Sequence, residues 1–328
     1  MAIEKEQGRE KNNRLTVASD IETFDEKPRE IEVKLDSNGF PKAAAFFDID
    51  GMLGTFGQFH GEAVKLLFPK IEDKEELARV FMRGLHLGTT YRVFHRMIGI
   101  YEEGKEEWKD PDNYSKWLHE NPERQKEVDG SGPIHERAAR FSMLHSTESA
   151  RLAEEKYREN PQVFEQIKNK PVFHLAKLYQ RLGIPMSIMT TNDEPFARSI
   201  CKCLGLADSF IAMACQKNFP KQSKEGAIDF LINRLKEKGI PIPKNLIVVG
   251  DSLTGDIGSG ARFARGQKEY SVKGVLITEE SVRKAKERIE NDSQLANMSV
   301  EVLNPEMVII DKKGMSSLAR YRREYSTK

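Results

Sequence analysis

Short apolar runs and helical patterns alternate along the second half of the chain. After Pro171, brief runs of apolar residues, which are typical of buried strands, are separated by longer segments with apolar residues at helical spacing. The predicted strands cover residues 186–189, 210–214, 246–249, 273–277 and 307–310. The predicted helices cover residues 172–182, 195–204, 225–237, 257–265, 281–290 and 315–325. This alternation predicts an α/β fold with a doubly wound parallel sheet.

The first half of the chain contains one strand of the same kind, followed by a long helical segment. Residues 43–48, Ala-Ala-Ala-Phe-Phe-Asp, form a run that suits a strand buried on both faces. Residues 60–170 are rich in charged side chains, with apolar residues at helical spacing and no comparable strand. This insertion begins just past the carboxyl end of the first strand, where open α/β sheets bind ligands. We therefore expect an inserted all-helical cap that closes over that edge of the sheet.

These patterns divide the chain into three parts. We expect residues 1–40 to be a flexible N-terminal extension, because most of this segment is polar and lacks periodicity. Residues 31–35 alternate and predict a short edge strand within it. The α/β core is expected at residues 41–58 and 171–328, and the helical cap at residues 59–170.

Composition narrows the classes of function. The 52 basic and 51 acidic side chains give a formal net charge of +1, which argues against binding nucleic acid or anionic membranes through bulk charge. No apolar run approaches the roughly 20 residues that cross a bilayer, and the charged start lacks the apolar segment of a secretory signal. Cys201, Cys203 and Cys215 form no disulfide framework. We expect a cytoplasmic protein.

Acidic residues follow two of the apolar runs. Asp48 and Asp50 end the first, and Gly51 then permits a sharp turn. Asp251 and Asp256 follow the run 246–249 in the same way. Asp and Gly also populate ordinary loops, but two such endings at one sheet edge favour a set of hard oxygen ligands. The pattern predicts a magnesium site made by Asp48, Asp50, Asp251 and Asp256.

Polar residues that suit a phosphate group follow in the sequence. Thr190 and Thr191 come directly after the run 186–189 and shortly before Pro195, a residue that favours the first turn of a helix. Hydroxyls and free N–H groups at a helix start can bind phosphate, although Thr is also an ordinary helix cap. Lys221 and Lys224 precede the helix that leads to residues 246–249, and either could reach this edge or remain on the surface.

In this order, the motifs resemble those of haloacid dehalogenase-like phosphatases. The resemblance rests on Asp48-Ile-Asp-Gly51, on Thr190, on a lysine before a helix, and on the segment from Gly250 to Asp256. It implies that Asp48 attacks phosphorus and that Asp50 protonates the leaving oxygen, then deprotonates the attacking water. It also implies that Mg²⁺ is held by Asp48, Asp50 and Asp251, with Asp256 supporting the metal or the lysine. The threonine and the lysine would bind the phosphoryl oxygens.

The resemblance predicts a magnesium-dependent phosphatase that hydrolyses the phosphate monoester of a small metabolite through an aspartyl-phosphate. A phosphomutase or other phosphotransferase of the same superfamily shares every motif and is the alternative. A non-catalytic phosphate-binding scaffold is a third possibility, and a signalling receiver is less well matched because receivers lack a large insertion after the first strand.

Arginines in the predicted cap offer a further hypothesis. Arg79, Arg83, Arg92 and Arg96 recur near helical spacing. They would form either a basic face directed at an anionic substrate or, as the composition of the segment favours, a solvated helix face.

Overall fold

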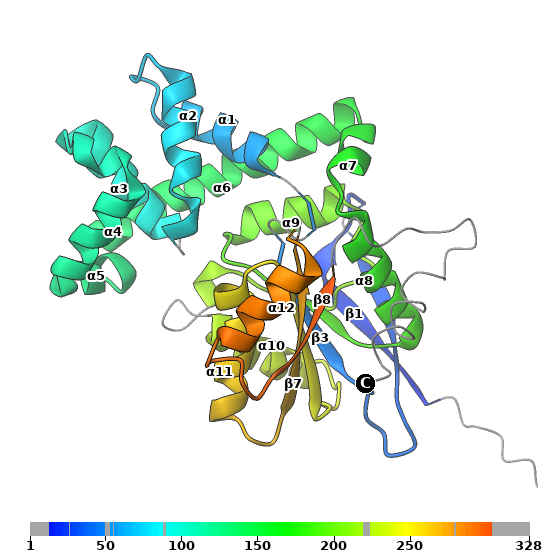
Figure 1. The fold of residues 1–328 in the computed structure, drawn as a ribbon. Helices are drawn as coiled ribbons and strands as arrows, with labels where there is room; N and C mark the ends of the chain where they lie inside the picture. The colour runs from blue at the N-terminus through cyan, green and yellow to red at the C-terminus, as the bar shows by residue number, and fades with distance from the viewer. Residues whose placement is uncertain are drawn as a thin grey trace, which may run out of the picture.

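The computed structural model describes residues 13–25, 27–49, 53–54, 56–87, 90–218, 224–278 and 280–303. Its main sheet has six parallel strands in the order β5-β4-β3-β6-β7-β8 (Figure 1). Their bounds are β3 Ala44–Phe47, β4 Met186–Met189, β5 Ala212–Ala214, β6 Asn245–Gly250, β7 Ser271–Ile277 and β8 Ser299–Leu303. The chain runs outward from β3 to β5 and then crosses to β6 on the other side of β3. This is the doubly wound order, and it confirms the predicted fold class.

Helices cover both faces of the sheet. The bounds of those in the core are α8 Lys170–Leu182, α9 Glu194–Cys203, α10 Lys224–Glu237, α11 Gly258–Gly266 and α12 Val282–Asn291. Helices α8 and α9 bury their apolar sides in one cluster with Phe47 and Ile188. Helices α10 and α11 pack on the other face, in a cluster with Phe46 and Val248. Successive residues of β3 thus serve opposite faces, as the period of two requires.

The predicted ends of the core elements are close to those observed. From β3 to α12, the bounds of each predicted strand and helix differ from the structure by at most two residues. The last strand is different: β8 lies at Ser299–Leu303, where no strand was predicted. Strand β8 lies at the edge of the sheet, and its sequence shows only the alternation of Val300 and Val302. This alternation is a weaker sequence signal for a strand than an apolar run. The predicted strand 307–310 and helix 315–325 lie outside the described residues.

The described part of the predicted insertion consists of helices joined by turns, with one isolated β-bridge between Lys168 and Gly54. Its elements are α1 Gly57–Leu67, α2 Lys74–Arg83, the 3₁₀ turn η1 Leu85–Leu87, α3 Thr90–Glu103, the 3₁₀ turn η2 Glu106–Lys109, α4 Pro111–Glu120, α5 Pro122–Asp129, α6 Pro133–Glu159 and α7 Gln162–Ile167. Helices α1 to α5 project away from the sheet, whereas the long α6 runs from them back across α9 (Figure 1). Ala153 and Phe164 belong to the core cluster of α8 and α9. The expected boundary at residue 170 between cap and core stays a prediction.

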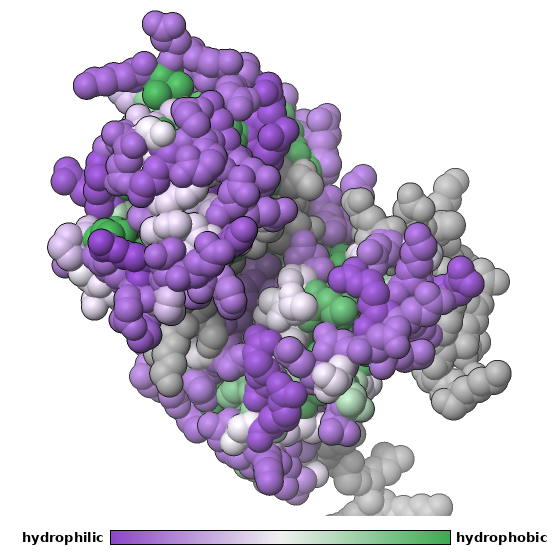
Figure 2. All heavy atoms as spheres, turned by 60° about the vertical axis from the view of Figure 1, so that its left-hand side comes forward, coloured by the Kyte–Doolittle hydropathy of each residue, from purple (hydrophilic) through white to green (hydrophobic). Residues whose placement is uncertain are grey.

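Three of the four predicted cap arginines do not contribute to a basic face, and the fourth, Arg83, is exposed at the end of α2. Arg96 is fully buried and donates to the backbone carbonyls of Val80, Trp108 and Lys109, at 3.0, 2.5 and 2.6 Å. Arg92 is paired with Asp129, and Arg79 with Glu76. Carbonyls at helix ends lack partners within their own helix, so Arg96 serves the packing of α2 against η2. The exposed face that Figure 2 shows is predominantly hydrophilic, with small scattered apolar patches.

Part of the expected N-terminal extension is ordered, so that expectation is wrong for residues 14–34. Strands β1 Arg14–Glu22 and β2 Pro28–Lys34 pair as an antiparallel hairpin, which includes the predicted edge strand. Val17, Ser19 and Ile21 face inward, and Ser19 conceals the alternation because it is polar. Its hydroxyl donates to the carbonyl of Phe210 at 2.6 Å. The hairpin thus gains the tertiary partners that a polar sequence does not reveal.

Asp20 fastens this hairpin to the core. Its amide donates to the carbonyl of Ile211, and its carboxylate accepts from Arg234 and Lys238, each at 2.8 Å. Lys34 donates its amide to Gly183, so the hairpin contacts the segments that enter β4 and β5. Burial disfavours the charged form of Asp20, but the two cations outweigh it and hold the pKa below the ordinary value of 3.8.

We predict that Asp20→Asn lowers the free energy of unfolding by about 1–2 kcal/mol at neutral pH, because the charge-assisted contacts with Arg234 and Lys238 weaken. A depressed carboxyl pKa stabilises the fold above the unfolded value, and this contribution is lost as the pH falls through the folded value. The difference between variant and wild type, measured by urea unfolding, should therefore shrink below about pH 4. Glu30→Gln, on an exposed residue of β2, is the matched control. A difference that persists undiminished in acid would contradict the assigned role.

Candidate active site

The carboxyl ends of β3 and β6 form the centre of the candidate site. Asp48 follows β3 directly, and its amide donates to the carbonyl of Val249 at 3.0 Å, so the ladder between the two strands reaches the aspartate. Asp251 follows β6 in the same way. The switch in strand order lies between β3 and β6, and open α/β sheets bind ligands at this place. The fold thus positions both side chains at the ligand-binding edge.

A tight turn after β6 brings a third carboxylate to this edge. Residues Leu253–Ile257 form a single π-helical turn, in which Asp256 is fully buried. The amide of Ser252 donates to the Asp256 carboxylate at 3.0 Å. A Cβ atom on Gly250 would lie 2.2 Å from that carboxylate, so only glycine fits beside it. Sequence reasoning found the two aspartates of this motif but not the steric reason for its glycine.

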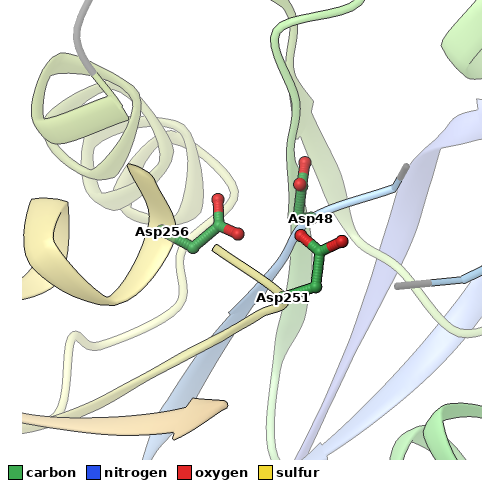
Figure 3. Close-up of side chains that lie close together, drawn as sticks. All are labelled: Asp48, Asp251 and Asp256. Carbon is green, nitrogen blue, oxygen red and sulfur yellow. The ribbon is translucent and has the colours of Figure 1, made fainter. Parts of the chain in front are cut away.

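The three carboxylates converge. One oxygen from each of Asp48, Asp251 and Asp256 can be chosen so that all lie within 4.8 Å of one another. Figure 3 shows Asp48 and Asp251 side by side at the strand ends, with Asp256 reaching toward them from the turn. Asp48 is 7% exposed, Asp256 is buried, and Asp251 is open to solvent. A ligand from solvent therefore has access on the side of Asp251.

Lys224, the first residue of α10, lies between two of these carboxylates. Its ammonium is 2.9 Å from Asp48 and 2.5 Å from Asp256. Burial alone would lower the pKa of Lys224, but the charges of Asp256 and Asp48 outweigh burial and raise the pKa above its ordinary value. The lysine is therefore charged at any physiological pH. Lys221, the other candidate, lies outside the described residues.

The donor set fits a hard divalent cation. Three carboxylates face a single ammonium, which leaves a surplus of negative charge among the described residues of the site. Like charges this close repel unless a cation or a shared proton offsets them. Carboxylate oxygens are the ligands that magnesium prefers in proteins. Asp50 is the fourth predicted ligand and lies outside the described residues.

The predicted phosphate-binding threonines follow the neighbouring strand β4. The register pairs Phe47 with Ile188, so Thr190 lies near the end of β3. Thr190 is buried, and its amide still pairs with Ala214 of β5. Its hydroxyl oxygen accepts from both the amide and the side-chain nitrogen of Asn192, at 3.1 Å each. These two hydrogen bonds occupy the lone pairs of the Thr190 hydroxyl oxygen, so its proton is left to donate to another group.

Thr191 differs from Thr190 in its surroundings. It is half-buried and begins the turn toward α9, whereas Thr190 still belongs to the ladder. Asn192 closes the turn, because its carbonyl accepts from the amide of Gln216 at 3.0 Å. The segment Thr190–Asn192 is therefore held from two sides, by β5 and by the residues after it. We refer to it below as the threonine loop.

Several solved structures are similar to this chain. A hydrolase from Pseudomonas syringae is 14% identical with a TM-score of 0.44, and the alignment covers 86% of this chain and 99% of that chain. CbbY from Rhodobacter sphaeroides, solved in complex with phosphate, is 15% identical with a TM-score of 0.44 and coverages of 80% and 93%. The β-phosphoglucomutase from Clostridium difficile is 14% identical with a TM-score of 0.44 and coverages of 86% and 96%.

No curated protein matches this chain. A family model does: the model of the haloacid dehalogenase-like hydrolases matches residues 42–263. That range is more than half of the chain, and it begins just before β3 and ends within α11. It includes the aspartates after β3 and β6, the threonine loop and Lys224. The chain belongs to the haloacid dehalogenase-like hydrolase family.

Proposed function

We propose that this protein is a magnesium-dependent phosphatase that hydrolyses a phosphate monoester of a small metabolite. The observation that carries the proposal is the convergence of Asp48, Asp251 and Asp256 beside a buried, charged lysine at the strand ends. Phosphoryl transfer needs a positioned nucleophile, a cation that offsets clustered negative charge, and fixed donors around the phosphoryl oxygens. The family assignment supports a hydrolase, and the presence of Asp50 in the sequence favours phosphate esters as substrates.

In the proposed first step, a carboxylate oxygen of Asp48 attacks phosphorus. The bond between phosphorus and the ester oxygen breaks, Asp50 gives its proton to the leaving oxygen, and an aspartyl-phosphate remains on Asp48. In the second step, water attacks that phosphorus and Asp50 takes the proton of the water. Inorganic phosphate leaves, and Asp48 regains its carboxylate. Lys224 orients Asp48 and offsets its charge, because the ammonium contacts it at 2.9 Å.

Asp48, Asp50, Asp251 and Asp256 would hold or support the magnesium ion. When bound, the ion supplies charge neutralisation, which lets an anionic phosphate approach a cluster of carboxylates. The hydroxyl of Thr190 donates to a phosphoryl oxygen, because Asn192 already occupies its acceptor positions. Thr191 and Lys221 remain further candidates for the same oxygens.

We predict that magnesium raises the thermal stability of the protein and that exhaustive chelation abolishes turnover. The ion binds the folded cluster and not the unfolded chain, so stability rises by mass action. Asp251→Asn should weaken the thermal shift while leaving Lys224 paired with its two aspartates. Asp208→Asn, on an exposed residue remote from the cluster in sequence, is the control. Full turnover after chelation, or an unchanged shift in Asp251→Asn, would exclude this metal site.

We predict that Thr190→Ala lowers kcat/KM for a phosphate ester by roughly 10- to 100-fold, and by more than Thr191→Ala does. The lost interaction is one hydrogen bond to a charged group, worth about 1.5–3 kcal/mol. Thr190→Ser keeps the hydroxyl and should restore most of the activity. Steady-state kinetics of the three variants would test the order. A larger loss at 191 would assign the phosphate contact to the other hydroxyl.

We predict that Asp48→Asn abolishes turnover and that Asp50→Asn slows it by roughly 100- to 10,000-fold. The first change removes the nucleophile, and the second removes the proton shuttle. With nitrophenyl phosphate, whose leaving group needs little protonation, Asp50→Asn should accumulate an aspartyl-phosphate because its hydrolysis still lacks a base. Intact-mass measurement after rapid quenching would detect the added phosphoryl group.

The same samples separate the rival assignments. A phosphoryl adduct on Asp48→Asn, or near-normal turnover of that variant, would mean that another residue is the nucleophile. A phosphorylated sugar converted to an isomer without release of phosphate would identify a mutase instead of a phosphatase.

A further inference from the structure

The long helix α6 contacts the core through small residues, three of them serines. Ser142, Ser146, Ser149, Ala150 and Ala153 are buried on one side of α6, and α6 packs closely against α9. The hydroxyl oxygen of Ser146 accepts from the amide of Phe196 in the first turn of α9, at 3.1 Å. A residue of the inserted segment thus caps a core helix, a role that usually falls to the helix's own N-cap residue.

Asp193 occupies that N-cap position but does not cap the helix with its side chain. Its carboxyl group instead lies 2.5 Å from the hydroxyl of Ser142. Asp193 directly follows the threonine loop, and it is 4% exposed. The carboxyl group is therefore turned away from the amides of its own helix and toward the inserted helices.

Three short contacts continue from Asp193 across the junction and return to the core. Ser142 of α6 lies 2.9 Å from the hydroxyl of Thr90, the first residue of α3. Thr90 in turn lies 2.5 Å from the side-chain oxygen of Gln216, which follows β5. The chain thus runs from the core through two cap hydroxyls to the core again. Both of its ends flank the threonine loop, because the amide of Gln216 donates to Asn192.

A count of protons limits the chemical state of this chain. The three contacts join two hydroxyl groups to a carboxyl oxygen at one end and an amide oxygen at the other. Each contact needs one proton, and the two hydroxyls supply only two. Were the Nε2 of Gln216, which is buried without a hydrogen-bond partner among the described residues in this orientation, to face Thr90 instead, it would supply the third proton. With the amide oxygen facing Thr90, as the structure has it, the third proton comes from Asp193. The protonated acid then donates to Ser142, Ser142 donates to Thr90, and Thr90 donates to Gln216.

The surroundings of Asp193 favour the neutral acid. Glu194, the first residue of α9, forms an ion pair with Lys217. This nearby cation therefore offsets the charge of Glu194 rather than that of Asp193. From α3, Tyr91 lies beside Asp193; burial raises the pKa of Tyr91 to about 12, so it remains a neutral phenol. From α6, Ser142 and Ser146 face it, and neither titrates. Burial raises the pKa of Asp193, against smaller opposing effects of Ser142 and Lys217.

We propose that Asp193 is a positioning residue that holds a proton in the folded protein and, as a neutral acid, ties the cap helices α3 and α6 to the threonine loop. The importance of that loop for phosphate rests on the proposed function, whereas the protonation of Asp193 does not. When Asp193 loses its proton, one of the three contacts lacks a hydrogen and a buried charge is left with too few donors. The connection between cap and loop then weakens.

Protonation of Asp193 makes the stability of the folded protein depend on pH in one direction. A carboxyl whose folded pKa lies above its unfolded value binds more protons in the folded state, so stability falls as the pH rises through the window between the two values. The window begins at the ordinary value of 3.8. Asp193→Asn is nearly isosteric and cannot ionise, and its amide can donate to Ser142 as the acid does. The variant should therefore escape the loss of stability that the wild type shows.

The test is thermal unfolding of the full chain from about pH 4 to pH 9. We expect the melting temperature of Asp193→Asn to rise relative to that of the wild type as the pH increases. At pH values above the window, the variant should melt a few degrees higher than the wild type. Thr147→Ala, which removes an exposed hydroxyl of α6, should show no such pH-dependent difference. A wild type that gains stability over Asp193→Asn with rising pH would show that Asp193 is ionised in the fold and would overturn the proposal.

Infrared spectroscopy gives a second measurement that does not depend on how well the variant folds. The wild type should show the carbonyl stretch of a protonated carboxyl group, lost as the pH rises and absent from Asp193→Asn. Absence of that band in the folded wild type throughout the window would also overturn the proposal.

Binding of sulfate in the presence of magnesium tests the link to the threonine loop, since the charge of sulfate is constant over this range. Sulfate affinity of the wild type should fall severalfold as the pH rises, and that of Asp193→Asn should fall less. The expected stability difference without any effect on sulfate affinity would leave the protonation assigned but overturn the role in anion binding. That outcome would count against the proposed function rather than against the proton on Asp193.

Discussion

Repulsion among carboxylates at one edge of the sheet is the constraint on which the rest of this structure depends. Two unit charges 4 Å apart repel by about 1 kcal/mol in water and by about 4 kcal/mol near a protein surface. Carboxylate oxygens of Asp48, Asp251 and Asp256 lie within 4.8 Å of one another because β3, β6 and the turn after β6 end together. Lys224 offsets part of the repulsion, so the start of α10 must lie between two of the acids. Four segments are thereby tied to one point.

The other edge of the sheet is held by ordinary structural interactions. The hairpin of β1 and β2 hydrogen-bonds to the segments that enter β4 and β5, and Asp20 pairs with Arg234 of α10 and with Lys238, which directly follows α10. Helix α10 therefore carries a charged contact at each end, Lys224 at the first turn and Arg234 near the last. Through α10, the position of Lys224 in the site is connected to the β1–β2 hairpin, which contributes no side chain to the site.

The inserted helices contact the core at further places besides the two connecting segments through which the chain enters and leaves them. The second half of α6 lies on α9, and the serines of α6 bond to the residues that begin that helix. Because α9 follows the threonine loop directly, a displacement of α6 would be felt at Thr190.

The sequence by itself determined the elements whose signals are local. Runs that are mostly apolar predicted the strands from β3 to β7, because a strand buried on both faces tolerates few polar residues. The acids after β3 and β6, and the helical character of the insertion, follow from residues adjacent in the chain. Asp50 and Lys221 lie outside the described residues, so their roles are still predictions from the resemblance alone.

Tertiary structure alone decided the features that join distant segments. Ser19 faces inward because its hydroxyl donates to the backbone carbonyl of Phe210. The sequence pattern of the hairpin does not indicate that partner. Arg96 looks like a surface residue until helix ends 12 to 16 positions away supply three carbonyls. The contacts that run from Asp193 to Ser142, from Ser142 to Thr90 and from Thr90 to Gln216 bring together four regions of the chain. The physical reason is the same in each case: a polar side chain is buried only where folding brings it a partner, and the partner's place in the sequence carries no mark of the pairing.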